Sequence, residues 1–250
     1  MRVLIISDIH SNLEALEAVL AAAPEYDAVW NLGDTVGYAA NPNEVIEKMQ
    51  HLEAMSIRGN HDRACTGLAH SDDFSPIADC AVQWTRGVLT REHSRWLERL
   101  LLGPVSPNGP DTSCVHGSPV HEDEYLFSAD DALLAFRAAP ARVTFFGHTH
   151  QQGGFATDGK DLYTLGPLYS TDDDEDEYEL PLRRGFRYLL NPGSAGQPRD
   201  GDWRAAFAIY DEERKLFTWH RAPYDVSKTQ DRIRDAGLPD FLAIRLRAGR

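Results

Sequence analysis

The order of apolar and polar segments in the first 150 residues constrains the fold more than any other feature of this sequence. Short apolar runs of strand length alternate with stretches in which apolar residues recur at helical spacing. The expected strands are Val3–Ser7, Ala28–Leu32, Ala54–Arg58, Thr112–His116 and Arg142–Gly147. This alternation is typical of a layered α/β protein and argues against a helical bundle or an all-β sandwich.

Helices are expected between these strands. One begins after a cap at Ser11 or Asn12, and another follows Asn41-Pro42-Asn43. Three more are expected at Ser75–Arg86, Glu92–Leu101 and Ser128–Ala138.

From Gln151 onward the sequence is rich in Gly, Thr, Tyr and Phe, which indicates antiparallel strands. These are expected at Asp161–Leu165, Phe186–Leu190, Ala206–Tyr210 and Phe217–Arg221. A mostly parallel first half and an antiparallel second half predict an α/β fold of two packed mixed β-sheets flanked by helices. We expect a single domain over residues 1–250, with a core of about 1–224 and a C-terminal helical extension of about 225–250.

Charge and cysteine content exclude several classes of protein. The net charge is −14, and six of the negative charges lie in the acidic run 172–177, which we expect to be a solvated loop. An acidic chain disfavours binding to long nucleic acid, which depends on Lys and Arg. The three cysteines form no CxxC pair, and no apolar run is long enough to cross a bilayer. A cytoplasmic protein without membrane partners is therefore expected, and a homo-oligomer is left open.

Five polar clusters stand at the ends of the apolar runs of the first half. They are Asp8-Ile9-His10, Gly33-Asp34, Gly59-Asn60-His61-Asp62, His116-Gly117 and Gly147-His148-Thr149-His150. In open α/β sheets, ligands bind beyond the carboxyl ends of the strands, so side chains from different strands meet there. One cluster alone is a weak signal, but five at five strand ends predict a single site.

In this order, the clusters resemble the motifs of the calcineurin-like metallophosphoesterase superfamily. The segment Asn191–Arg199, with the sequence NPGSAGQPR, resembles the closing motif of the small bacterial and archaeal phosphodiesterase branch. The resemblance runs from Met1 to about Asp211 and implies a four-layer αββα sandwich.

The resemblance also implies the residues of a dinuclear metal centre. One ion would take Asp8, His10, Asp34 and His150, and the other would take Asp34, Asn60, His116 and His148, with Asp34 bridging the two. His61 would face the substrate as a proton donor or charge stabiliser without binding metal. Asp62 is expected either to orient His61 or to cap the helix that follows. Imidazole, carboxylate and amide donors without thiolate suit two divalent transition-metal ions, namely Mn, Fe, Zn, Ni or Co.

The activity implied is that of a phosphoesterase, a hydrolase acting on phosphodiester or phosphomonoester bonds of a small phosphate-ester substrate. A metal-bound hydroxide would attack phosphorus directly, without a Ser or Cys nucleophile. The alternative is a non-catalytic scaffold that uses the same fold to bind proteins. The presence of every ligand and of His61 favours the enzyme.

Several other polar residues are weaker candidates. Asn12, Arg63, Asn191 and Arg199 could reach a bound phosphate, although Asn191-Pro192-Gly193 is also an ordinary turn signal. His121 follows the His116 cluster, but its acidic neighbours argue against a substrate contact. His51, His70, His93 and His220 are expected on the surface, and Cys114 is expected in the core.

Overall fold

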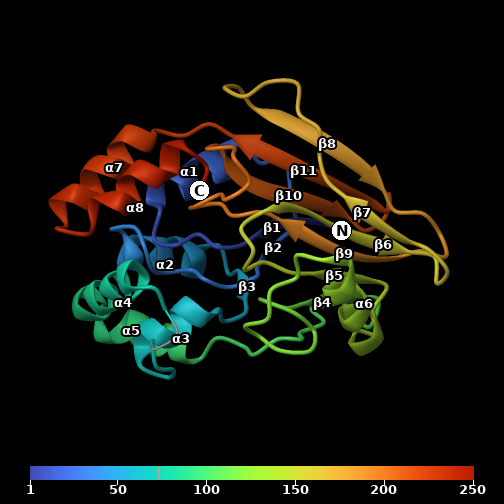
Figure 1. Cartoon of the computed structure of the whole chain (residues 1–250), viewed down its shortest axis with the longest axis horizontal. Helices are drawn as coiled ribbons and strands as arrows, with labels where there is room; N and C mark the ends of the chain where they lie inside the picture. Colours follow the sequence, from blue (N-terminus) through green and yellow to red (C-terminus); the bar gives the residue numbers. More distant parts are fainter. Residues whose placement is uncertain (72–73) are drawn as a thin grey trace.

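Two mixed β-sheets form the centre of the molecule (Figure 1). The computed structural model describes residues 1–71 and 74–250. The first sheet has the strand order β3-β2-β1-β10-β11-β8, and the second has the order β4-β5-β9-β6-β7. The strands are β1 (Arg2–Ile6), β2 (Ala28–Asn31), β3 (Met55–Ser56), β4 (Thr112–Cys114), β5 (Val143–Phe145), β6 (Gln152–Thr157), β7 (Leu162–Leu165), β8 (Asp176–Pro181), β9 (Arg187–Pro192), β10 (Ala205–Asp211) and β11 (Leu216–Ala222).

Helices cover the outer faces of both sheets, which confirms the predicted αββα arrangement (Figure 1). They are α1 (Leu13–Ala22), α2 (Pro42–His51), α3 (Asn60–Thr66), α4 (Pro76–Val88), α5 (Arg91–Glu98), α6 (Ala129–Ala138), α7 (Val226–Asp235) and α8 (Asp240–Arg247). The side chain of Asn12 caps α1 by accepting a hydrogen bond from the backbone N–H of Ala15.

Strand β1 shows how the sequence divides the core between the two faces of a sheet. Val3 and Ile5 point into the layer between the sheets, where they join Phe145 and Trp219. Leu4 and Ile6 point to the opposite face and pack with α1 and α2. This alternation follows from the two-residue period of a strand, and these four side chains of β1 are fully buried. Strand β1 therefore holds the following Asp8 loop on a rigid support.

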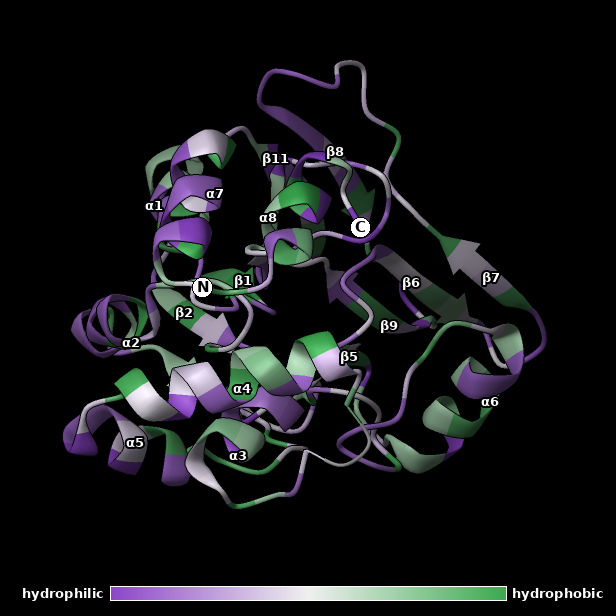
Figure 2. Cartoon of the chain, turned by 60° about the vertical axis from the view of Figure 1, so that its left-hand side comes forward, coloured by the Kyte–Doolittle hydropathy of each residue, from purple (hydrophilic) through white to green (hydrophobic). Residues whose placement is uncertain are grey.

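The last two helices pack over the end of the molecule that carries α4. Leu242 and Leu246 of α8 share an apolar cluster with Ala78 and Ala81 of α4 and with Tyr38. Helix α7 lies beside α8 and contacts α1 (Figures 1 and 2). The visible face of α7 in Figure 2 is mostly hydrophilic, as expected of a helix that buries only one side. This packing brings the C-terminal residues close to the N-terminal loops.

The structure also corrects some expectations. Strands β6 and β8 were not predicted, and the helix expected after Asp62, for which the sequence gives no bounds, begins at Asn60 as α3. The acidic run is not entirely a loop, because Asp176 and Glu177 begin β8 and pair with Arg221 and His220 of β11. His93 and His220 are buried, contrary to the surface expectation, and His220 stacks on the ring of Phe207 with 4.8 Å between the centroids.

No helix among residues 1–71 and 74–250 is long and apolar enough to cross a membrane.

Candidate metal centre

The predicted polar clusters meet at one edge shared by both sheets. Asp8 and His10 follow β1, Asp34 follows β2, and Asn60 follows β3 in the first sheet. His116 follows β4, and His148 and His150 follow β5 in the second sheet. The strands β1 to β3 run parallel to one another, as do β4 and β5, so their carboxyl ends converge. The site is therefore assembled from two sheets rather than one.

Five of these residues have backbone conformations that side chains with a Cβ adopt infrequently. The φ angles are 53° at Asp8, 49° at His10, 53° at Asp34, 65° at His148 and 59° at His150. Left-handed non-glycine residues cost energy and concentrate at functional sites. Their concentration here indicates that the loops are shaped to aim side chains at one point.

The first group of converging side chains contains Asp8, His10, Asp34 and His150. They are all buried, and each offers one ligand atom within 4.8 Å of the others. The Asp8 carboxylate is held through Oδ2, which accepts hydrogen bonds from the Ser7 hydroxyl and from the backbone N–H of His148. Its other oxygen, Oδ1, is buried without a hydrogen-bond partner among the described residues and lies 3.4 Å from His150 Nε2. A buried carboxylate oxygen without a donor is costly, and a cation would satisfy it.

The two histidines of this group present lone pairs to each other. His10 Nδ1 donates to the carbonyl of Val36 and His150 Nδ1 donates to that of Gln197, because a carbonyl can only accept. Burial lowers the pKa of both histidines well below its usual value, so both rings are neutral. Their Nε2 atoms, which then carry no proton, lie 3.1 Å apart. Two acceptors at this separation repel each other unless a cation lies near both.

The second group contains Asp34, His116 and His148, and Asn60 adjoins it. His116 Nδ1 donates to the carbonyl of Leu32, so its Nε2 faces Asn60 Oδ1 at 3.2 Å and Asp34 Oδ2 at 3.5 Å. His148 Nε2 donates to the carbonyl of Asp123, which leaves Nδ1 to face the site. Nitrogen and oxygen atoms of these side chains thus converge on one point, as in the first group.

Asp34 belongs to both groups. Its Oδ1 accepts a hydrogen bond from the backbone N–H of His61, and its Oδ2 lies 3.6 Å from His10 Nε2 and 3.5 Å from His116 Nε2. Burial alone would raise the pKa of Asp34, but His116 and His61 outweigh it and hold that pKa well below its usual value. The same pairing raises the pKa of His116 to about 10, against the opposing effect of burial. Asp34 is thus an ionised carboxylate placed between the two groups.

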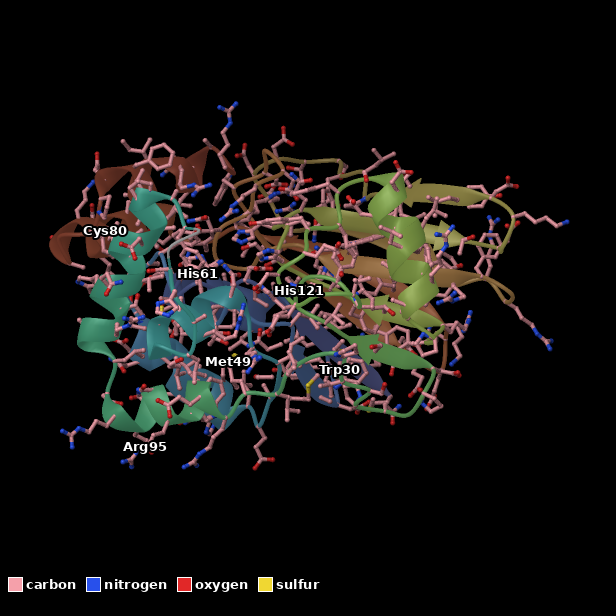
Figure 3. The ribbon with its side chains drawn as sticks, turned by 60° about the horizontal axis from the view of Figure 1, so that its bottom comes forward. Trp30, Met49, His61, Cys80, Arg95 and His121 are labelled. Carbon is pink, nitrogen blue, oxygen red and sulfur yellow. The ribbon has the colours of Figure 1, made fainter. Side chains whose placement is uncertain are left out.

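His61 and Asp62 have separate roles in the structure. His61 is buried on α3, inward of the peripheral Arg95, and lines the cavity above the clusters (Figure 3). Its Nδ1, next to Gly37, has no hydrogen-bond partner among the described residues. Burial lowers the pKa of His61 to about 4, although the charge of Asp34 acts in the opposite direction. The ring is therefore neutral at pH 7.

The hydrogen bonds of Asp62 are made with backbone groups. Its carboxylate accepts hydrogen bonds from the backbone N–H groups of Gly59 and Val36, and within the described part of the chain none joins it to His61. Of the two roles that the sequence left open, the helix cap is the one that the contacts show. Burial and the charge of Asp34 raise the pKa of Asp62 to about 7. The prediction that Asp62 acts on His61 is thus not supported by a contact.

A cavity of about 280 Å³ opens above the clusters. Asn60, His148 and His150 form part of its floor, and Arg199 and Arg245 lie on its wall. Arg199 was expected near a phosphate, whereas Arg245 was missed. The only sequence signal for Arg245 was its position in an expected helical extension, which does not indicate where that extension packs.

The other weak candidates are engaged elsewhere. The Asn12 amide donates to the carbonyl of Gly196, and Asn191 donates to the carbonyl of Gly147 and to the hydroxyl of Thr149. Arg63 forms ion pairs with Glu122 and Asp123. His121 is exposed on the loop after His116 and does not line the cavity (Figure 3). Asn191 is thus structural, and Cys114 is buried as predicted.

Gly59 provides a test of the Asp34 position. A Cβ added at Gly59 would overlap Asp34 Oδ1 and lie 2.5 Å from the Asp34 backbone nitrogen, so the carboxylate would have to move. We expect Gly59→Ala to lower metal affinity about 10-fold to 100-fold, the range seen when a supporting contact of a ligand is lost. Equilibrium dialysis with Mn²⁺ measures this. Gly87→Ala is the control, because a Cβ there meets no atom within 4 Å. Equal affinities in the two variants would contradict the expected effect.

The fold and the site define an αββα protein whose strand ends carry two groups of potential metal ligands that share one aspartate. The comparison with known proteins confirms the resemblance seen in the motifs. The chain belongs to the calcineurin-like phosphoesterase superfamily, whose domain model matches residues 1–215.

Three similar proteins from bacteria and archaea illustrate the relationship. The crystal structure of a metallophosphoesterase from Sphaerobacter thermophilus is 41% identical, covers 100% of this chain and 99% of its own, and has a TM-score of 0.87. An uncharacterized protein of Methanocaldococcus jannaschii is 36% identical, over 98% of this chain and 97% of its own length. A hypothetical protein from Pyrococcus horikoshii shares the fold, with a TM-score of 0.76 at 20% identity, over 100% of this chain and 98% of its own.

Proposed function

We propose that this protein is a dinuclear metal-dependent phosphoesterase that hydrolyses phosphodiester or phosphomonoester bonds of a small substrate. The observation that carries the proposal is the pair of neutral imidazoles, His10 and His150, whose Nε2 atoms face each other at 3.1 Å beside the unpartnered Asp8 Oδ1. Membership in a phosphoesterase superfamily supports the reaction class.

The two groups of side chains suit two ions. In this proposal one ion takes Asp8, His10, Asp34 and His150, and the other takes Asp34, Asn60, His116 and His148. The three carbonyl groups that hold His10, His116 and His150 fix each ring with Nε2 turned inward. The mixture of nitrogen and oxygen donors suits Mn, Fe, Zn, Ni or Co.

When bound, such ions supply positive charge for the phosphoryl oxygens and an activated water as the nucleophile. The chain itself supplies the surroundings of the reacting group. His61, neutral and buried at the cavity wall, donates an N–H from Nε2 to a phosphoryl or departing oxygen. Arg199 adds a positive charge on the same wall. Burial raises the pKa of the Cys65 and Cys114 thiols, so neither is a nucleophile.

Metal analysis combined with a substrate screen tests the proposal. We expect about two transition ions per chain, one for each group of ligands. Phosphomonoesters, phosphodiesters and nucleotides should be screened with Mn, Ni, Co, Zn and Mg. Activity should disappear on chelation and return when metal is added back. Full activity in a chelated sample free of transition ions would contradict the mechanism.

The same screen addresses the scaffold alternative, because a scaffold would bind partners without turnover of any ester. The long nucleic acids disfavoured by the charge of −14 should not be cleaved. The cytoplasmic location and an assembly of identical copies stay predictions.

A further inference from the structure

Two arginines from distant parts of the chain share the wall of the cavity. Arg199 ends the NPGSAGQPR segment, and Arg245 lies in the last turn of α8, beyond the residues that the family model matches. Both guanidinium groups lie over the ring of Tyr38, with Cζ at 5.7 Å from the ring centroid for Arg199 and 5.9 Å for Arg245. The ring of Tyr38 also packs on His10 and His61, at 4.6 Å and 4.4 Å between centroids. The arginine pair therefore lies one aromatic ring away from the metal-ligand cluster.

Neither arginine is paired with an Asp or Glu side chain among residues 1–71 and 74–250. Arg199 contacts the Tyr38 hydroxyl and the Gln197 side-chain oxygen, and its buried Nε has no hydrogen-bond partner among those residues. Arg245 donates from Nε to the main-chain oxygen of Arg250, the last residue described. By contrast, Arg204 and Arg221, which are also buried, are each paired with an aspartate. Two half-buried cations that face one cavity without an Asp or Glu partner form a favourable site for an anion.

Arg245 is held in place by the packing of its helix. Leu242 and Leu246, its neighbours on α8, are buried against α4. Phe241, one turn earlier on α8, packs against the Arg245 side chain. The Cζ atom of Arg245 lies 5.5 Å from the centroid of the Phe241 ring. Burial and the charge of Arg199 lower the pKa of Arg245 to about 10, which still leaves it charged at pH 7. The packing of α8 therefore holds Arg245 close to Arg199 although their positive charges repel each other.

We propose that Arg199 and Arg245 bind a second phosphate group of the substrate, next to the phosphoryl group that reacts at the metal cluster. This deepens the proposed function and rests on it for the position of the reacting group. A phosphate fits better than a carboxylate, because two guanidinium forks need more acceptor oxygens than one carboxylate offers. The substrate class is then a compound with two phosphate groups, such as a nucleoside diphosphate or a bisphosphate, and Arg245 is a specificity-determining residue.

Binding of stable analogues tests this inference without hydrolysis. Methylenediphosphonate carries two phosphonate groups joined by a P–C–P link with no ester or anhydride bond to cleave, and methylphosphonate carries one. Titration calorimetry on the full chain as purified should show at least about 10-fold tighter binding of the diphosphonate. In Arg245→Gln this ratio should fall about 10-fold, as expected for a lost charge-assisted hydrogen bond. Arg247→Gln, an exposed position on the same helix, should keep the wild-type ratio.

Two further measurements separate a role of Arg245 in binding the second phosphate from a general effect of the Arg245→Gln substitution. Arg245→Lys retains the charge without the fork, so it should fold and give an intermediate ratio. In the metal-loaded enzyme, kcat/KM for p-nitrophenyl phosphate, which has a single phosphate, should fall by a smaller factor in Arg245→Gln than the affinity for the diphosphonate does. An unchanged binding ratio in that variant, or an equal loss for both phosphonates, would overturn the inference. Absence of any esterase activity would count against the proposed function alone, because the binding comparison does not depend on turnover.

Discussion

Asp34→Asn should lower kcat at least about 100-fold and reduce the bound metal at both groups of ligands. Asp34 Oδ2 lies between His10 Nε2 and His116 Nε2, at 3.6 Å and 3.5 Å, so it serves both groups. An amide removes the negative charge that two cations would share. Loss of a contact that only supports a ligand already costs about 10-fold to 100-fold, and loss of a bridging ligand should cost more. Metal content measured by mass spectrometry, together with steady-state kinetics, checks both effects.

The control for this variant is Asp161→Asn, which removes a carboxylate from an exposed turn outside the cavity. It should keep two ions and wild-type kcat. If Asp34→Asn lost only one ion, or kept turnover, Asp34 would not bridge two metals. The substitution should leave the N-terminus of α3 in place. The side-chain oxygen of the introduced asparagine can still accept the hydrogen bond that the backbone N–H of His61 donates to Asp34. A folded variant with reduced metal is therefore the expected product.

The candidate site was predictable because its signals are local. Asp8, Asp34 and His116 each follow a short apolar run within one or two residues, and parallel strands place such positions at one edge of a sheet. The division of the β1 side chains between the two faces of the sheet follows from the two-residue period of a strand. Sequence reasoning did not predict that the edge belongs to two sheets, because strand pairing depends on long-range contacts such as that of β5 with β9.

The features that the sequence did not indicate depend on tertiary packing. Strand β8 begins inside an acidic run, and it forms through its backbone pairing with β11, a segment that lies further along the chain. His220 is buried because Phe207 stacks on it. Arg245 lies 46 positions after Arg199 in the chain, and only the docking of α8 on α4 brings the two to one cavity. These three features thus depend on contacts between distant segments of the chain, which residue type and periodicity do not predict.

His61→Ala should keep both metal ions but lower kcat about 10²-fold to 10³-fold, the usual range for loss of a hydrogen-bond donor to the charge that develops in the transition state. His61 is absent from both groups of converging ligand atoms but lines the cavity with them. Its buried Nδ1 lies against Gly37, which leaves Nε2 as the nitrogen available to a substrate. Tyr38 and Phe74 hold the ring, at 4.4 Å and 4.7 Å between centroids, so its direction is fixed before a substrate arrives.

The pKa of His61 determines how this residue would act. With a pKa of about 4 in the fold, against 6.5 in a free histidine, the ring is neutral above about pH 5 and donates a hydrogen bond rather than a full positive charge. His61→Gln retains a donor of similar reach, so it should recover part of the lost kcat without changing metal content. His93→Ala, which removes a buried histidine on α5 outside the cavity, controls for the loss of packing and should leave kcat unchanged. A metal-free His61→Ala protein would show instead that His61 is a ligand, because only a ligand or its support changes metal content.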